Sequence, residues 1–174
     1  MEVNPAKELI VKQYHFNLKF AEKLVEDIPP ELMTKSGGAG LENHPSFTLG
    51  HLVTASAMTS EDLGGTYEVP DGWKNLFQRK GPGDPRKPEL DSLLYPSKEK
   101  LLSELNKQHE KVVEGLKAAD DEFLLSSCKW RFDQFFPTIL DLVTFMCISH
   151  ESMHLSQLSA WRRAMGMSSA LAAL

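Results

Sequence analysis

The chain has few of the features that mark secreted, membrane-spanning or disulfide-bonded proteins. Only two of its 174 residues are cysteines, Cys128 and Cys147, so no disulfide framework can form. The N-terminal residues lack the apolar stretch of a secretory signal. The most apolar segment, 138–149, contains Asp141 and is too short to cross a bilayer. We therefore expect a protein of the reducing cytoplasm with no membrane partner.

Basic residues are also scarce. Lys and Arg number 19 against 24 Asp and Glu, which gives a formal net charge of −5. Nucleic-acid binding requires a positive surface, and no long run of basic residues occurs, so we expect no nucleic-acid partner. The chain is long enough for one domain with a proper core, and residues 1–174 show neither repeats nor a second domain.

Apolar residues recur at steps of three and four, which predicts long helices and few strands. Prolines stop the first helix, Ser46 and Ser97 are suited to capping the second and third, and Gly166 closes the last. Four helices with a strand-poor remainder predict an all-α fold, a four-helix bundle. The expected helices cover residues 5–27, 46–63, 98–116 and 137–165.

Glycine and proline are concentrated between the second and third helices. Residues 64–96 contain five of each, together with large apolar side chains such as Trp73 and Phe77. So much apolar surface does not belong on a disordered linker, so we expect an ordered loop packed against the bundle, with a short helix over 73–79. Such loops serve as lids or binding loops, or they cap the end of a bundle, and both interpretations remain open.

The last helix contains the sequence His150-Glu151-Ser152-Met153-His154. Residues four apart lie on one face of a helix, so both imidazoles can reach one ion. They continue an apolar stripe, where two neutral imidazoles need polar partners. A metal ion would satisfy both, whereas the alternative is a pair of core histidines bonded to other side chains.

The same residues match the His-Glu-x-x-His signature of zinc proteases, in which the Glu acts as general base. The metzincin pattern requires Gly and His where this chain has Gln157 and Ala160. No Asp, Glu or His follows His154, so a downstream acidic ligand is excluded as well. The protease interpretation fails, and the third ligand must lie upstream.

Four other histidines are candidates for that ligand. His51 leads because it lies in an apolar setting beside Gly50, which would permit close approach, although periodicity alone does not decide. His44 precedes a proline in an expected loop, and His15 lies off the main stripe, so we expect both to be exposed. His109 lies on the seam of the third helix and is interpreted first as a buried polar partner and second as a ligand.

Two segments resemble motifs of the DinB-like (YfiT-like) superfamily. One is His150-Glu151-Ser152-Met153-His154-Leu155-Ser156-Gln157, followed by Trp161-Arg162-Arg163-Ala164-Met165-Gly166, and the other is Ser46-Phe47-Thr48-Leu49-Gly50-His51-Leu52. The entry to the third helix, Tyr95-Pro96-Ser97, is also similar. This chain has Ser156 where the family often has Gly, which should matter little for a metal.

The resemblance implies an up-down-down-up four-helix bundle, frequent homodimerisation, and a site of three histidines, His51, His150 and His154. It implies zinc or nickel first as the divalent transition metal, and manganese or iron second. Characterised branches include transferases that use low-molecular-weight thiols, so a small-molecule substrate, such as a thiol, is implied.

Other residues near the pair have weaker roles. Glu151 adjoins His150 but points about 100° away around the helix, so a solvated or supporting carboxylate outweighs a general base, and no catalytic residue is assigned with more weight. Cys147 is expected to form part of a pocket wall. Gln157 and Arg162 are interpreted as packing or supporting residues.

Two functions follow from these observations. Three imidazoles leave coordination positions open, which favours a metal-dependent enzyme that activates a thiol or water, as a transferase or hydrolase. The alternative is a non-catalytic metal-binding stress-response protein, in which the ion holds the second and last helices together.

Overall fold

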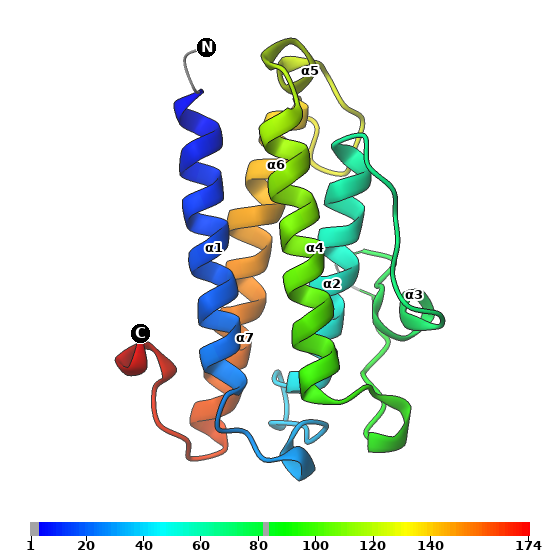
Figure 1. Ribbon diagram of the computed structural model, residues 1–174. Helices are drawn as coiled ribbons and strands as arrows, with labels where there is room; N and C mark the ends of the chain where they lie inside the picture. The colour runs from blue at the N-terminus through cyan, green and yellow to red at the C-terminus, as the bar shows by residue number, and fades with distance from the viewer. Residues whose placement is uncertain (1–3, 82–83) are drawn as a thin grey trace.

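In a computed structural model of the chain, residues 4–81 and 84–174 are described, and they form helices and no β-strand (Figure 1). A lone antiparallel bridge joins Ser127 to Thr138. The all-α class predicted from the sequence is therefore confirmed. None of the described helices combines the length and the apolar character that a membrane span requires.

The first three long helices begin where local caps satisfy their free amides. Helix α1 (Pro5–Val25) follows Asn4, whose side chain accepts from the amide of Ala6. Helix α4 (Lys98–Ala118) has the predicted cap, Ser97. Helix α2 (Pro45–Asp62) begins one residue earlier than predicted because His44, and not Ser46, is its N-cap.

The last long helix consists of three consecutive segments. They are α6 (Ile139–Thr144), a π-helical turn η3 (Phe145–His150) and α7 (Glu151–Ala164). The helix begins at Ile139 and not at Pro137, because Thr138 and Asp141 form a capping box around the first turn. It ends before Gly166, whose positive φ of 73° suits glycine.

The long helices pack side by side. Helices α1 and α2 each lie against both α4 and the last helix. Figure 1 shows that α1 and the last helix run in one direction while α2 and α4 run in the other. Two short helical elements lie in the connections between the long helices: η1 (Pro30–Leu32) and α5 (Asp121–Leu125), which was not predicted. A third, η4 (Ala170–Ala173), follows the last long helix.

The described residues between α2 and α4, 63–81 and 84–97, form the ordered excursion that the sequence predicted. It contains α3 (Trp73–Phe77) and the turn η2 (Ser92–Leu94). Trp73 and Phe77 are buried in the main apolar cluster. Helix α3 ends at Phe77, two residues before the predicted end at Arg79.

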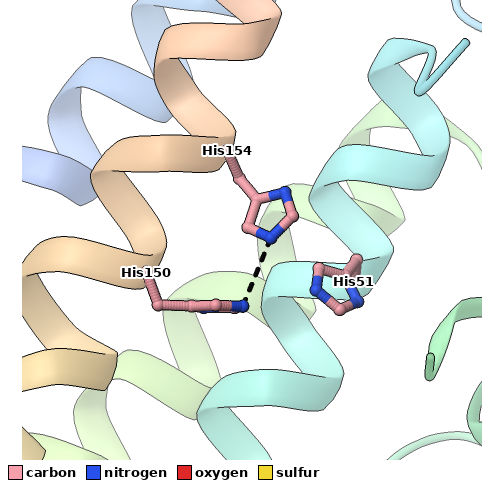
Figure 2. Close-up of side chains that lie close together, drawn as sticks. All are labelled: His51, His150 and His154. Atoms are coloured by element: carbon pink, nitrogen blue, oxygen red, sulfur yellow. Dashed lines mark hydrogen bonds between the residues drawn. The ribbon is translucent and has the colours of Figure 1, made fainter. Parts of the chain in front are cut away.

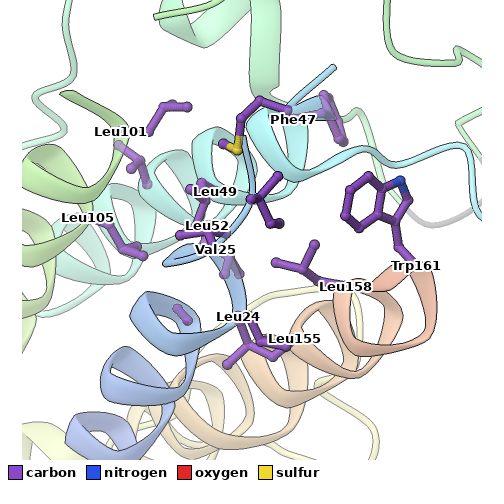
Figure 3. Close-up of a cluster of buried hydrophobic side chains, with 14 of the residues drawn as sticks. Leu24, Val25, Phe47, Leu49, Leu52, Leu101, Leu105, Leu155, Leu158 and Trp161 are labelled. Carbon is purple, nitrogen blue, oxygen red and sulfur yellow. The ribbon is translucent and has the colours of Figure 1, made fainter. Parts of the chain in front are cut away.

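Apolar side chains form two clusters at different levels along the helices. The larger includes Leu24, Leu52, Leu105, Leu158 and Trp161 (Figure 3). The smaller includes residues from the opposite end of α1, α2 and α4 and from α6. Between the two clusters each long helix contributes a buried polar residue, and we call these four the polar layer: Asn17, Ser56, His109 and Glu151.

Candidate metal centre

Three imidazoles converge beside the polar layer. His51 comes from α2, His150 ends the π-helical turn and His154 lies one turn further in α7 (Figure 2). Each offers a ring nitrogen, and the three nitrogens all lie within 4.8 Å of one another. Among the described residues, no cysteine or carboxylate joins this cluster. The structure thus brings the predicted pair, His150 and His154, together with His51, the third histidine that the family resemblance implied.

The spacing between His150 and His154 suits a shared ion. Their Nε2 atoms are 3.2 Å apart. Two imidazole nitrogens that bind one zinc ion tetrahedrally, at bond lengths of 2.0–2.1 Å, lie about 3.3 Å apart. The separation of these two atoms therefore matches the spacing that a common metal would require.

The ring of His51 is oriented by a hydrogen bond to a residue of the excursion. Its Nδ1 atom lies 3.1 Å from the carbonyl oxygen of Phe77, and an imidazole bonded to a carbonyl carries its proton on that nitrogen. Nε2 is then left with a free lone pair. Metal-binding histidines typically make this second hydrogen bond, which fixes the tautomer and the orientation of the ring.

Gly50 is the reason that Phe77 can come so close to α2. A Cβ atom at position 50 would lie 2.3–2.4 Å from three atoms of the Phe77 ring. Any other residue would push the ring away and carry the carbonyl with it. The close approach expected beside Gly50 is therefore made by Phe77, a residue that sequence reasoning did not connect with the site.

Burial keeps all three imidazoles neutral at pH 7. Desolvation, reinforced by His51, lowers the pKa of His150 to about 4. Desolvation and the neighbouring histidines lower the pKa of His154 to about 2. The pKa of His51 is lowered as well, mainly by desolvation and slightly by Arg79. Neutral rings present the lone pairs that a metal ion requires.

The hydrogen bonds of the pair support the same conclusion. One proton at most can lie between the two facing Nε2 atoms, so at least one of them has only a lone pair directed at its neighbour. Two neutral rings packed in this way are incompletely satisfied by protein groups. A cation bound to both Nε2 atoms would engage both lone pairs, so the residues present fit a divalent metal.

Glu151 lies on a different face from the histidines, as its place on the helix predicted, but it is not solvated. Its side chain is 2% exposed and its Oε1 atom lies 2.7 Å from Nε2 of His109. Desolvation raises the pKa of Glu151, while His109 partly opposes that shift. Of the two roles expected for Glu151, that of a solvated carboxylate is wrong because the residue is buried in the polar layer, whereas that of a supporting carboxylate is not contradicted.

His109 is a buried polar partner outside the three-histidine cluster, as its place on the apolar seam of the third long helix predicted. Its ring stacks on Tyr14 with centroids 3.6 Å apart. Tyr14 in turn donates to the hydroxyl of Ser56. Tyr14 thus links Ser56 to the His109–Glu151 pair, and neither His109 nor Glu151 belongs to the three-histidine cluster.

His44 contradicts the expectation of an exposed loop residue, because it is fully buried. Its Nδ1 atom accepts from the amide of Phe47, and its Nε2 atom lies 3.0 Å from the carbonyl oxygen of Glu89. Burial lowers its pKa to about 4. The position before Pro45, at the start of a helix, was the available signal for a capping role. His15 is exposed, as expected.

The remaining predicted residues have packing roles. Cys147 belongs to the smaller apolar cluster, and burial raises the pKa of its thiol. Arg162 is buried, pairs with Asp27 and binds backbone carbonyls. Gln157 contacts Asn43 near the surface.

Comparison with known proteins agrees with this architecture. The family model of the DinB superfamily matches residues 13–158, a span that contains all three histidines. No curated protein and no solved structure gave a significant match. Because the matched segment covers most of the chain, the protein belongs to the DinB superfamily.

Proposed function

We propose that His51, His150 and His154 bind one divalent transition metal, and that the bound metal activates a thiol or water for transfer or hydrolysis. The observation that carries this proposal is the convergence of three neutral imidazoles without a fourth protein ligand among the described residues. Structural zinc sites normally use four protein ligands, whereas catalytic sites keep a position for water or substrate. A metal bound in this way lowers the pKa of coordinated water or thiol towards neutrality.

The side chains around the cluster orient the ligands and donate no obvious acid or base. Phe77 fixes the tautomer of His51 through its carbonyl. Glu151 is bonded to His109 inside the polar layer and is therefore unsuited to accept a proton from a substrate. The reactive group would then be the thiol or water that a metal held by His51, His150 and His154 activates. Zinc and nickel suit imidazole ligands best, with manganese and iron as further candidates.

The family resemblance implies two further features, a bundle topology and homodimerisation, and the packing of the helices supports the first of them. The neighbours and directions of the long helices favour an up-down-down-up four-helix bundle. Homodimerisation stays a prediction, which the molar mass in solution would test.

Metal binding is tested by elemental analysis of protein purified without a histidine tag. We expect about one transition-metal ion per chain. His154→Ala should lose it, because only two ligands remain. His15→Ala is the matched control, since that histidine is exposed and lies on α1. Equal metal content in wild type and His154→Ala would refute the ligand assignment.

Activity is tested separately with the metal-loaded protein. Glutathione, bacillithiol or mycothiol is mixed with an electrophile, and the loss of free thiol is followed. If the protein is a transferase, we expect at least one of these thiols to be consumed. His154→Ala should abolish that consumption. No consumption with any of them would argue against it.

The non-catalytic alternative is favoured by one observation, namely that the ligands come from α2 and the last helix, which pack together. An ion there would link the two helices. This alternative expects metal to raise the melting temperature while neither thiol consumption nor hydrolysis is detected.

A further inference from the structure

Arg79 is a partly buried cation with no carboxylate at ion-pair distance among the described residues, and Asp84 acts on it only at longer range. No carboxylate among the described residues pairs with its guanidinium, and its Nη2 atom is buried without a hydrogen-bond partner there. By contrast, Arg162 pairs with Asp27 and Arg86 pairs with Asp84. A guanidinium that is removed from water and left unpaired is unfavourable unless a ligand completes it.

The guanidinium lines a cavity of about 340 Å³. The other cations of its wall are engaged elsewhere, because Arg86 binds Asp84 and Lys87 binds Glu42. Among the described residues of that wall, the exposed Glu89 is the one carboxylate. Arg79 is therefore the cation with free hydrogen-bonding capacity in a cavity large enough for a small molecule.

This cavity lies close to the candidate metal centre. The guanidinium carbon is 4.2 Å from the centroid of the Phe47 ring, which stacks on His51 at 5.9 Å. The guanidinium and the His51 ring are thus at most about 10 Å apart. In the chain, Arg79 follows by two residues the carbonyl that orients His51. An extended small molecule is long enough for such a distance, and because none of the three histidines lines the cavity itself, it would have to pass beside the Phe47 ring.

We propose that Arg79 binds an anionic group, a carboxylate or a phosphate, on the small molecule whose other end reaches the metal. The planar fork of a guanidinium matches either group with two parallel hydrogen bonds. Stacking on Phe47 holds the plane of the fork in place. The link to the metal rests on the proposed function, whereas anion binding by Arg79 does not.

Anion binding is tested first in metal-free protein. Succinate and inorganic phosphate are titrated separately while the backbone amide resonances of residues 75–81, which wild type and variants share, are followed by NMR. We expect saturable binding of at least one anion, at least ten-fold weaker in Arg79→Gln. The tighter of the two anions identifies the ligand class. Arg163→Gln is the matched control, because that residue is exposed on the last helix.

Two outcomes would overturn the proposal: no saturable binding of either anion, or equal binding by wild type and Arg79→Gln. Arg79→Lys keeps the charge and loses the fork, so intermediate binding is expected. Circular dichroism melts of both variants verify that the fold is retained.

The link to the metal is tested in cobalt-loaded protein. The thiolate-to-cobalt absorption band is followed with 6-mercaptohexanoate and with 6-mercaptohexanol, which differ only in the carboxylate. Wild type should prefer the carboxylate at least ten-fold, and Arg79→Gln should show no preference. An equal preference in both proteins contradicts the proposal. Absence of the band with both thiols argues against thiol activation, while the metal-free titration still decides the role of Arg79.

Discussion

Gly50→Ala tests whether the close contact between α2 and the excursion controls the metal centre. The added Cβ would lie 2.3–2.4 Å from three ring atoms of Phe77, which is fully buried. Overpacking of this kind destabilises a core by about 1–3 kcal/mol, whereas replacing glycine by alanine inside a helix contributes about 1 kcal/mol of stability. We expect a net loss of up to about 2 kcal/mol in the free energy of unfolding of metal-free protein.

The same substitution should weaken metal binding. Moving Phe77 moves the carbonyl that orients His51, and loss of such a supporting hydrogen bond typically weakens metal affinity about 10–100-fold. Urea denaturation measures the first effect, and competition with a chromophoric chelator measures the second.

Gly115→Ala is the matched control, because Gly115 also lies inside a helix, α4. A Cβ there meets Leu63 at 3.2 Å, a tight but adjustable contact, so we expect almost unchanged stability and metal affinity. The double variant Gly50→Ala/Phe77→Leu should regain stability because the smaller side chain relieves the overlap. If Gly50→Ala matched Gly115→Ala in both measurements, the contact would not control the site.

Two further predictions concern buried histidines outside the metal cluster. His109→Ala removes the partner of buried Glu151 and should lower the free energy of unfolding by about 3–5 kcal/mol, measured by urea denaturation at pH 7; a loss below 1 kcal/mol would contradict a paired network. Because the pKa of His44 is lowered from 6.5 to about 4, this residue takes up its proton more readily in the unfolded chain than in the folded one. Its contribution to the free energy of unfolding is therefore complete above pH 6.5 and declines as the pH falls towards 4, by about 3 kcal/mol in all. His44→Asn can still cap α2 without titrating, so its unfolding free energy should fall less steeply over that range, and parallel pH profiles would contradict the assignment.

The helices were predictable because their signals are local. Pro5 at a first turn, Ser97 as a cap and Gly166 as a C-terminal stop each act within a few residues. The proximity of His150 and His154 was equally local, since it requires only one turn of helix.

The surroundings of the histidines depend on contacts between distant segments, and single-residue patterns do not contain them. Phe77 reaches His51 only because the excursion folds back on α2, and Glu89 reaches His44 by the same path. Arg79 had no sequence signal at all. The burial of Glu151 was missed because a regular α-helix was assumed where the chain makes a π-helical turn.

That turn sets the rotational phase of the last helix. Val143, Cys147, Glu151 and Leu155 are all buried, at successive steps of four residues. In a regular α-helix three such steps would drift about 120° around the axis. The wider turn η3 absorbs much of this drift and keeps one inward stripe over the whole length. A single-residue deletion within 145–149 would therefore turn η3 into a regular α-helical turn and leave Val143 and Leu155 about three whole α-helical turns apart, so α6 should keep its orientation relative to the histidines.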